Sequence, residues 1–120
     1  MANFRELKVY QKLYRLAVDI DIFTRKLSRA IQFDLADQIR RASKSIPTNI
    51  VEGYARNKSK KDIANFLKNA LGSNDECLVH LDFLKDLKHI KENQYLEYRS
   101  RFEEVGKMLY GLHKTLLTSN

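Results

Sequence analysis

The chain has 120 residues, of which 22 are Lys or Arg and 15 are Asp or Glu, so its formal net charge is +7. This length is typical of one domain, and 43% hydrophobic residues suffice to fill one core, which excludes a disordered chain. One Pro and four Gly are too few for the many turns of an all-β sandwich or barrel. The composition therefore predicts a single helical domain over residues 1–120.

No stretch long enough to span a membrane lacks charge, and the first residues, MANFRELKVYQK, carry four charges where a signal peptide needs an apolar segment. We therefore expect a cytoplasmic protein without membrane contact. The single cysteine, Cys77, cannot form an intramolecular disulfide, which fits a reducing compartment or a protein that does not depend on redox chemistry. The pI of about 9.6 indicates an acidic partner.

The first predicted helix covers residues 5–27. Its apolar residues alternate between spacings of four and three, which is the pattern of a helix that buries one face. These residues are Val9, Leu13, Leu16, Ile20, Phe23 and Leu27.

The second apolar pattern covers residues 35–54 and passes through Pro47. A proline inside a helix removes one hydrogen bond and crowds the carbonyl four residues earlier, that of Ser43. Either the helix ends at Pro47 or it continues with a kink, and the unchanged register of the apolar residues on both sides favours the kink. Gly53 and Gly72 also lie inside helical patterns, where each costs about 1 kcal/mol relative to Ala, and so indicate close helix packing.

Two further apolar patterns predict a third and a fourth helix. The third pattern has heptad spacing and consists of Ile63, Leu67, Ala70, Asn74, Cys77, Leu81 and Leu84. The fourth consists of Tyr95, Tyr98, Phe102, Val105, Leu109, Leu112 and Leu116. Ser59 followed by Asp62 is typical of a helix start, and we expect Asn93 to serve similarly for the fourth helix.

The predicted helices are long and their connections, at residues 28–32, 57–59 and 91–93, are short. Short connections make consecutive helices antiparallel neighbours. The simplest architecture is therefore an up-down-up-down antiparallel four-helix bundle whose second helix is kinked at Pro47.

Nothing in the sequence assembles into a catalytic or metal site. The histidines are scattered and no Glu-x-x-His pair occurs, so the ligand set of a di-iron bundle is missing. Cys77 and His80 share a helix face, but two ligands do not make a structural zinc site. There is no Gly-rich phosphate loop and no nucleophile elbow. We expect no cofactor, and Cys77 is better explained as a small core residue.

Several polar residues lie in or near the apolar patterns. Asn74 lies within the third pattern, and Asn49, Glu52, Ser73 and Glu76 lie close to apolar positions. We favour a hydrogen-bonded polar layer that fixes helix register. A general acid/base pair of Glu52 and Glu76 is the alternative, but no nucleophile or pocket accompanies it.

The positive charge is concentrated in the first half, since residues 1–60 carry 13 basic and 6 acidic side chains and residues 61–120 carry nine of each. Seven basic residues fall between Gln38 and Lys61, opposed only by Glu52. They are Arg40, Arg41, Lys44, Arg56, Lys58, Lys60 and Lys61. We expect the first three to project from the core in a row that neutralises phosphates. The alternatives are a solvated face and pairing with acids of a neighbouring subunit.

The run QIRRASKSIPTNIVEGYAR, Gln38 to Arg56, is followed by Lys60, Lys61, Phe66, Ala70, Gly72, Ser73 and Glu76. These residues, together with the opening FRELKVYQK, resemble the bacterial four-helix-bundle proteins encoded by intervening sequences of 23S rRNA genes. That family also contains the accessory variability determinant of diversity-generating retroelements. Arg40, Arg41 and Arg56 match its basic positions, and Asn49, Glu52, Gly53, Gly72, Ser73 and Glu76 match its polar and small positions. Leu71 departs from the pattern, because a basic residue often precedes the glycine.

The resemblance implies a homopentameric barrel of four-helix bundles with a basic surface that binds nucleic acid in some members. In the retroelement branch, it implies a reverse transcriptase as partner. Our first hypothesis is therefore a non-enzymatic homo-oligomer that binds structured RNA or DNA through phosphates, with low specificity because no aromatic side chain interleaves the basic row. A protein-interaction adaptor is the second hypothesis, and an enzyme using Glu52 and Glu76 is the third.

Overall fold

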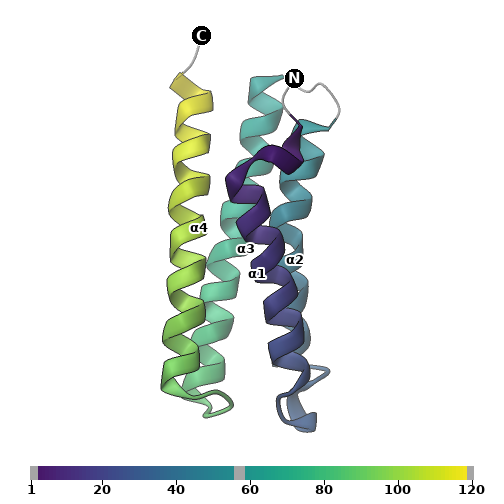
Figure 1. Cartoon of the computed structure of the whole chain (residues 1–120), viewed down its shortest axis with the longest axis vertical. Coiled ribbons are helices and arrows are strands. Elements are labelled where there is room, and N and C mark those ends of the chain that lie inside the picture. The colour runs from purple at the N-terminus through teal and green to yellow at the C-terminus, as the bar shows by residue number, and fades with distance from the viewer. Residues whose placement is uncertain (1–2, 56–58, 119–120) are drawn as a thin grey trace.

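The protein, in a computed structural model that describes residues 3–55 and 59–118, is all-α, as predicted. Its helices are α1 (Lys8–Arg25), α2 (Leu35–Tyr54), α3 (Lys60–Asp86) and α4 (Glu92–Thr118), with two short 3₁₀ helices, η1 (Phe4–Glu6) and η2 (Arg29–Ile31). No strand occurs in the described ranges. The helices lie side by side in a rod with extents of 48 × 21 × 20 Å (Figure 1).

Each helix packs against the next one in the chain, and α1 also contacts α4, which closes the bundle. The contact between α2 and α3 is the most extensive and that between α1 and α4 is the smallest. In Figure 1, α1 begins, α2 ends, α3 begins and α4 ends at the same end of the molecule, which we call the upper end. The other end is the lower end.

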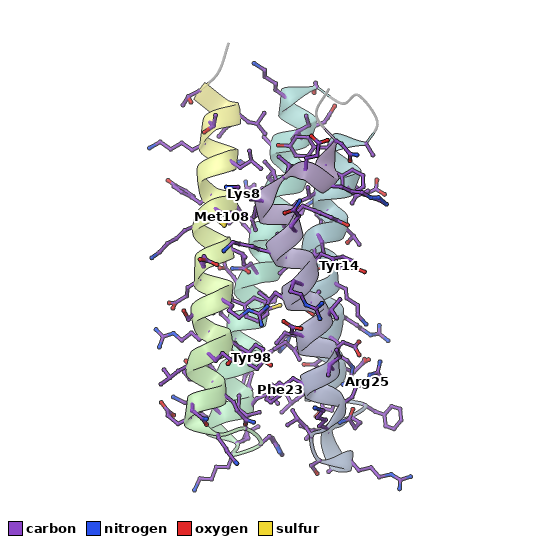
Figure 2. All side chains as sticks on the ribbon, in the orientation of Figure 1. Lys8, Tyr14, Phe23, Arg25, Tyr98 and Met108 are labelled. Carbon is purple, nitrogen blue, oxygen red and sulfur yellow. The ribbon has the colours of Figure 1, made fainter. Side chains whose placement is uncertain are left out.

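The core is built from the predicted apolar patterns, because each places one face of its helix toward the bundle axis. Among the side chains that are less than 2% exposed are Leu13, Leu16, Ile20, Ile39, Ile46, Ile50, Leu67, Leu81, Leu84, Phe102 and Leu109. Near the lower end the core reaches the α1/α4 contact, where the rings of Phe23 and Tyr98 face each other with centroids 4.8 Å apart (Figure 2).

The first helix begins later than predicted. The Oδ1 atom of Asn3 accepts a hydrogen bond from the Arg5 N–H (3.0 Å) and caps η1, and Leu7 is extended. The α-helix therefore begins at Lys8, and it ends at Arg25. A polar cap before the expected start has produced a separate short turn.

Of the two predicted helix starts, that of α3 is confirmed and that of α4 is wrong. The Ser59 hydroxyl accepts a hydrogen bond from the Asp62 N–H (3.1 Å). In contrast, α4 begins at Glu92, so Asn93 lies inside its first turn. The side chain of Gln94 instead accepts a hydrogen bond from the Lys91 N–H (2.9 Å), because it reaches back to the open end of the helix.

The helix α2 continues through Pro47, which is buried, so it does not end there. The prediction of close packing holds for Gly53, where an added Cβ would lie 3.2 Å from the Phe66 Cβ. It is wrong for Gly72, whose missing side chain would meet no atom within 4 Å. A glycine that sequence analysis passed over, Gly106, is the closest-packed one, because its Cβ would lie 2.8 Å from the Asn74 Nδ2.

Candidate nucleic-acid interface

Arg40 lies inside the protein. Its exposed fraction is 4%, and its guanidinium donates hydrogen bonds to Thr24 Oγ1 (3.1 Å), Gln32 Oε1 (3.1 Å) and the Gln32 carbonyl (2.8 Å). The prediction that Arg40 projects away from the core is therefore wrong. Its donors bind neutral groups of α1 and of the connection to α2, and hold that connection against α2.

The physical reason is a second buried face on α2. Ala36, Arg40, Ser43 and Pro47 are spaced four, three and four residues apart, and all are buried. Because α2 packs against both α1 and α3, its buried surface is wider than one apolar stripe. Arg40 belongs to this second stripe, whose other members are small and so leave room for a long side chain.

Arg41 and Lys44 are exposed, as predicted, but both form ion pairs. The Arg41 Nε lies 2.9 Å from Asp37 Oδ2, one helical turn earlier. The Lys44 Nζ donates to Asp21 Oδ2 on α1 (2.6 Å), and hydrogen bonds from Lys44 and then Arg25 lower the pKa of Asp21 below its ordinary value. Exposed ion pairs of this kind contribute at most about 1 kcal/mol, so a phosphate can replace the carboxylate.

Of the rest of the predicted basic zone, the two residues that the structure describes, Lys60 and Lys61, lie at the upper end. Arg56 and Lys58 fall outside the described residues. Lys60 and Lys61 are exposed on the first turn of α3. The structure therefore separates the zone into a buried arginine, two paired cations and the lysines of α3.

The lysines of α3 line a groove between α3 and α4, which we call the α3/α4 groove. Its volume is about 720 Å³, within the range of ligand pockets. It is lined by Lys60, Lys61, Ala64, Asn65, Lys68, Leu71, Tyr110, His113, Leu116 and Leu117. None of these residues is acidic, and neither Lys61 nor Lys68 forms an ion pair with a described residue. The groove thus combines cations with apolar side chains in its lining.

Sequence analysis missed Lys68, Tyr110 and His113 as members of this groove. Two signals were present. Lys61 and Lys68 are seven residues apart, which places them on one face of a helix. Tyr110 is an aromatic residue outside the apolar pattern of its helix, and it is 61% exposed. Neither signal indicates which helix faces which, so only the packing of α3 against α4 brings them together.

A second groove, the α1/α2 groove, has a different character. Its volume is about 500 Å³ and its surface is mainly apolar. It is lined by Tyr10, Tyr14, Ala17, Val18, Asp21, Ile22, Lys44, Pro47, Thr48 and Val51. Elsewhere, Val79 and Phe83 on α3 and Leu87, the residue directly after the helix, follow one another at four-residue spacing and are 50–57% exposed. We call these three residues the α3 ridge.

The predicted polar residues occupy varied environments. The Asn49 Nδ2 donates to the Ser45 carbonyl (2.7 Å) of its own helix, and Gln38 makes a longer hydrogen bond of 3.4 Å to Asp34. Asn49 and Ser73 are half-buried, and Gln38 is exposed. Among the described contacts they form no layer that crosses between helices. The Asn74 Nδ2, in contrast, donates to the Phe102 carbonyl of α4 (3.0 Å), while its Oδ1 has no partner among the described residues.

The two carboxylates of the alternative acid/base pair lie on different helices, Glu52 on α2 and Glu76 on α3. Glu52 and Glu76 are exposed, and neither lines either groove. Cys77 is fully buried in the core, and this burial raises the pKa of its thiol far above the ordinary value. Within residues 3–55 and 59–118, no three His, Cys, Asp or Glu side chains gather where they could hold a metal ion.

Comparison with known proteins identifies the family of this chain. The family model of the 23S rRNA-intervening sequence proteins matches residues 5–111. The chain belongs to this family. No curated protein matches it. A crystal structure from Bacteroides thetaiotaomicron VPI-5482, described as a protein with unknown function from the S23 ribosomal protein family, is similar, with a TM-score of 0.81 and 29% identity over 89% of this chain and 96% of that one.

The family match covers the predicted basic zone and most of the α3/α4 groove, since it ends just after Tyr110. The predicted resemblance of the sequence to the 23S rRNA-intervening sequence proteins is therefore confirmed. Among the described residues, no helix combines the length and apolar character that crossing a membrane requires.

Proposed function

We propose that this 23S rRNA-intervening sequence protein is a non-enzymatic homo-oligomer that binds nucleic acid, with structured RNA as the preferred ligand. The observation that carries the proposal is the α3/α4 groove, where three lysines and a histidine meet without an acidic side chain. Such a surface gains free energy by releasing the counterions of phosphates. The positions of Glu52 and Glu76, on different helices and outside both grooves, support a binding role rather than a catalytic one.

The binding surface extends from the α3/α4 groove to the upper end of the bundle, where Lys60 and Lys61 lie. Arg41 adds an exposed cation on α2 at the cost of a weak ion pair, whereas Lys44 lines the α1/α2 groove, which the assembly proposed below fills. Arg40 takes no part, because its guanidinium is already used inside the protein. Binding through phosphates positions a nucleic acid without reading its sequence.

The test is fluorescence anisotropy with a labelled RNA hairpin and a labelled DNA duplex from 50 to 300 mM salt. We expect both to bind, the hairpin more tightly, with affinity falling steeply as salt rises. A Lys61→Ala, Lys68→Ala variant should bind the hairpin more weakly, and its log–log salt slope should fall by about 1.8, or 0.9 for each lost contact. If the wild-type protein binds neither ligand at 50 mM salt, the proposal fails.

For the oligomer, we propose that the α3 ridge of one copy packs into the α1/α2 groove of the next. Both surfaces are apolar, and they lie on different helices. A contact between two different surfaces builds a closed ring where its rotation closes, and an open filament otherwise. The family resemblance sets the expected number at five.

Replacing Phe83 in the α3 ridge tests this assembly. Phe83→Ser should reduce the mass measured by light scattering to the 14.1 kDa of a single chain, since a polar residue removes the apolar contact. The matched control is Phe33→Ser, because Phe33 is 96% exposed in the connection between α1 and α2 and lies outside the proposed contact. A wild-type mass of one chain, or equal masses for both variants, would contradict the proposed contact.

A protein-interaction adaptor, such as a reverse-transcriptase accessory subunit, is the second candidate function. The apolar part of the lining of the α3/α4 groove, Leu71, Leu116 and Leu117, favours it, because an acidic amphipathic helix could contact the lysines and the leucines together. An adaptor would bind an acidic protein partner and would not bind the RNA hairpin at 50 mM salt. The anisotropy experiment therefore separates the two functions.

A further inference from the structure

We propose that the α3/α4 groove holds a short unpaired segment of nucleic acid, with one base stacked on Tyr110 and its phosphates on Lys61 and Lys68. This inference rests on the proposed nucleic-acid binding and makes it specific, because it names the single-stranded form as the ligand of this groove. The basic row of α2 contains no aromatic residue, whereas here the fold adds one from another helix.

Tyr110 has the properties of a stacking residue. It is 61% exposed and lines the groove from α4, and it forms no hydrogen bond or ring contact with a described residue. The other tyrosines of α4 differ, since Tyr95 and Tyr98 are buried and Tyr95 donates to Asp82 Oδ1 (2.7 Å). An exposed aromatic ring beside cations is the arrangement by which proteins bind single strands.

The spacing of the two lysines fits a strand that follows the groove. Lys61 and Lys68 are seven residues apart on α3, and at 1.5 Å per residue this is about 10 Å along the helix axis. A stacked strand rises by about 3.4 Å per nucleotide, so the axial spacing of these two helix positions corresponds to about three nucleotides. The groove therefore has room for a few nucleotides rather than a long tract.

The groove continues toward the lower end, where its charge changes. Leu71 and Tyr110 also line an adjoining hollow that contains Asp75, Glu103 and Lys107. The carboxylates repel phosphates, so the cationic part ends beyond Tyr110. The ring thus stands at the boundary of the cationic part, where a base can stack while the strand turns back to solvent.

A duplex does not offer this contact, because its bases are stacked on one another and are not free to stack on a side chain. Loops, bulges and single-stranded ends do offer unstacked bases. The inference therefore predicts a preference that phosphate contacts alone do not create.

The experiment compares a labelled single-stranded RNA 12-mer with a duplex of the same length by anisotropy at 100 mM salt. Tyr110→Ala should weaken single-strand binding by about 5- to 150-fold, the range expected for loss of one base stack, and should leave duplex binding unchanged. Tyr110→Phe should bind like the wild type, because the ring is kept. The control Phe33→Ala removes an exposed aromatic ring at the lower end and should have no effect.

The contribution of Lys61 and Lys68 is tested with a matched pair of lysines outside the groove. Lys61→Ala, Lys68→Ala should lower the single-strand salt slope by about 1.4, whereas Lys26→Ala, Lys91→Ala removes the same charge near the lower end and should not change it. The four lysines and Tyr110 are all exposed, so we expect these variants to fold. Circular dichroism verifies this.

The outcomes separate this inference from the proposed function. If the wild type binds neither strand nor duplex, nucleic-acid binding itself fails. If it binds but Tyr110→Ala binds the single strand as tightly, the function survives and the inference is overturned. A change in the oligomeric mass of Tyr110→Ala with unchanged binding would show that the groove holds a second copy of the chain, which also overturns the inference.

Discussion

Two neighbouring arginines of α2 have opposite environments. Arg40 is 4% exposed and donates three hydrogen bonds, whereas the side chain of Arg41 is 82% exposed and faces Asp37. A one-residue step turns a helical side chain by 100°, which here carries it from the interior to solvent. Any variant that changes both residues would therefore confuse folding with binding.

The first prediction concerns these two arginines. Arg40→Ala should lower the free energy of unfolding by about 2–4 kcal/mol, because it leaves the buried Thr24 hydroxyl and the half-buried acceptors of Gln32 without this donor and opens a cavity. Arg41→Ala should change it by about 0.5 kcal/mol or less, since its ion pair is exposed. Urea denaturation followed by circular dichroism measures both. Equal losses for the two variants would show that Arg40 does not hold the connection.

At the scale of the helices, α3 and α4 approach closely at Gly106, where the buried amide of Asn74 occupies the space of a side chain. The amide cannot easily withdraw, because its Nδ2 donates to the Phe102 carbonyl. Gly111, five residues further along the same helix, has no atom within 4 Å of the position that its Cβ would take. Within one helix, Gly106 is therefore needed for close packing, whereas the position of Gly111 has space for a side chain.

The second prediction uses this pair. Gly106→Ala should destabilise the protein by about 1–3 kcal/mol, since its Cβ would lie 2.8 Å from the Asn74 Nδ2. Gly111→Ala should instead stabilise it by up to about 1 kcal/mol through helix propensity. Thermal unfolding gives the sign of each change. A stabilised Gly106→Ala would mean that α4 can move away from α3 without loss.

The apolar patterns predicted the four helices because the period of a helix is a local property of the chain. The environment of Arg40 was not predictable in this way, because it depends on Gln32, which lies in a connection without periodicity. The α3/α4 groove likewise depends on the contact between two helices, so the sequence does not indicate that Lys61 and Tyr110 line the same groove. Sequence patterns describe the buried face of a helix better than they describe what its exposed face meets.

For the whole molecule, α1 is held to its neighbours by two aspartates. Asp19 accepts from Arg15 on its own helix and from Arg101 on α4, both at 2.8 Å, and Asp21 accepts from Lys44 on α2. A hydrogen bond from Arg15 first, and one from Arg101 as well, lower the pKa of Asp19 below its ordinary value of 3.8. Protonation of these two aspartates at low pH therefore weakens the contacts of α1 with its neighbours.

The third prediction follows from the sign of these shifts. A carboxylate whose pKa is lower in the folded protein stabilises it above the ordinary pKa, and this contribution disappears as the pH falls through the folded pKa. We expect stability to fall below about pH 4, also because protonation adds to the net charge of +7. Urea midpoints between pH 7 and pH 2 measure the loss, which should be smaller in Asp19→Asn, Asp21→Asn.

The control for this prediction removes two acids that form no ion pair among the described residues. Asp75→Asn, Glu97→Gln changes the net charge equally but leaves both aspartates of α1 in place. It should retain the full acid-dependent loss of the wild type. If the two double variants lose stability alike between pH 4 and pH 2, the effect comes from net charge alone.

The unequal helix contacts also have a consequence for motion. The contact of α1 with α4 is the smallest in the bundle, and that of α2 with α3 is the largest. Local opening begins where the fewest buried contacts must be broken. We therefore expect α1 to swing outward as a unit while α2, α3 and α4 stay together, so that backbone amides of α1 exchange with deuterium well before those of α2 and α3.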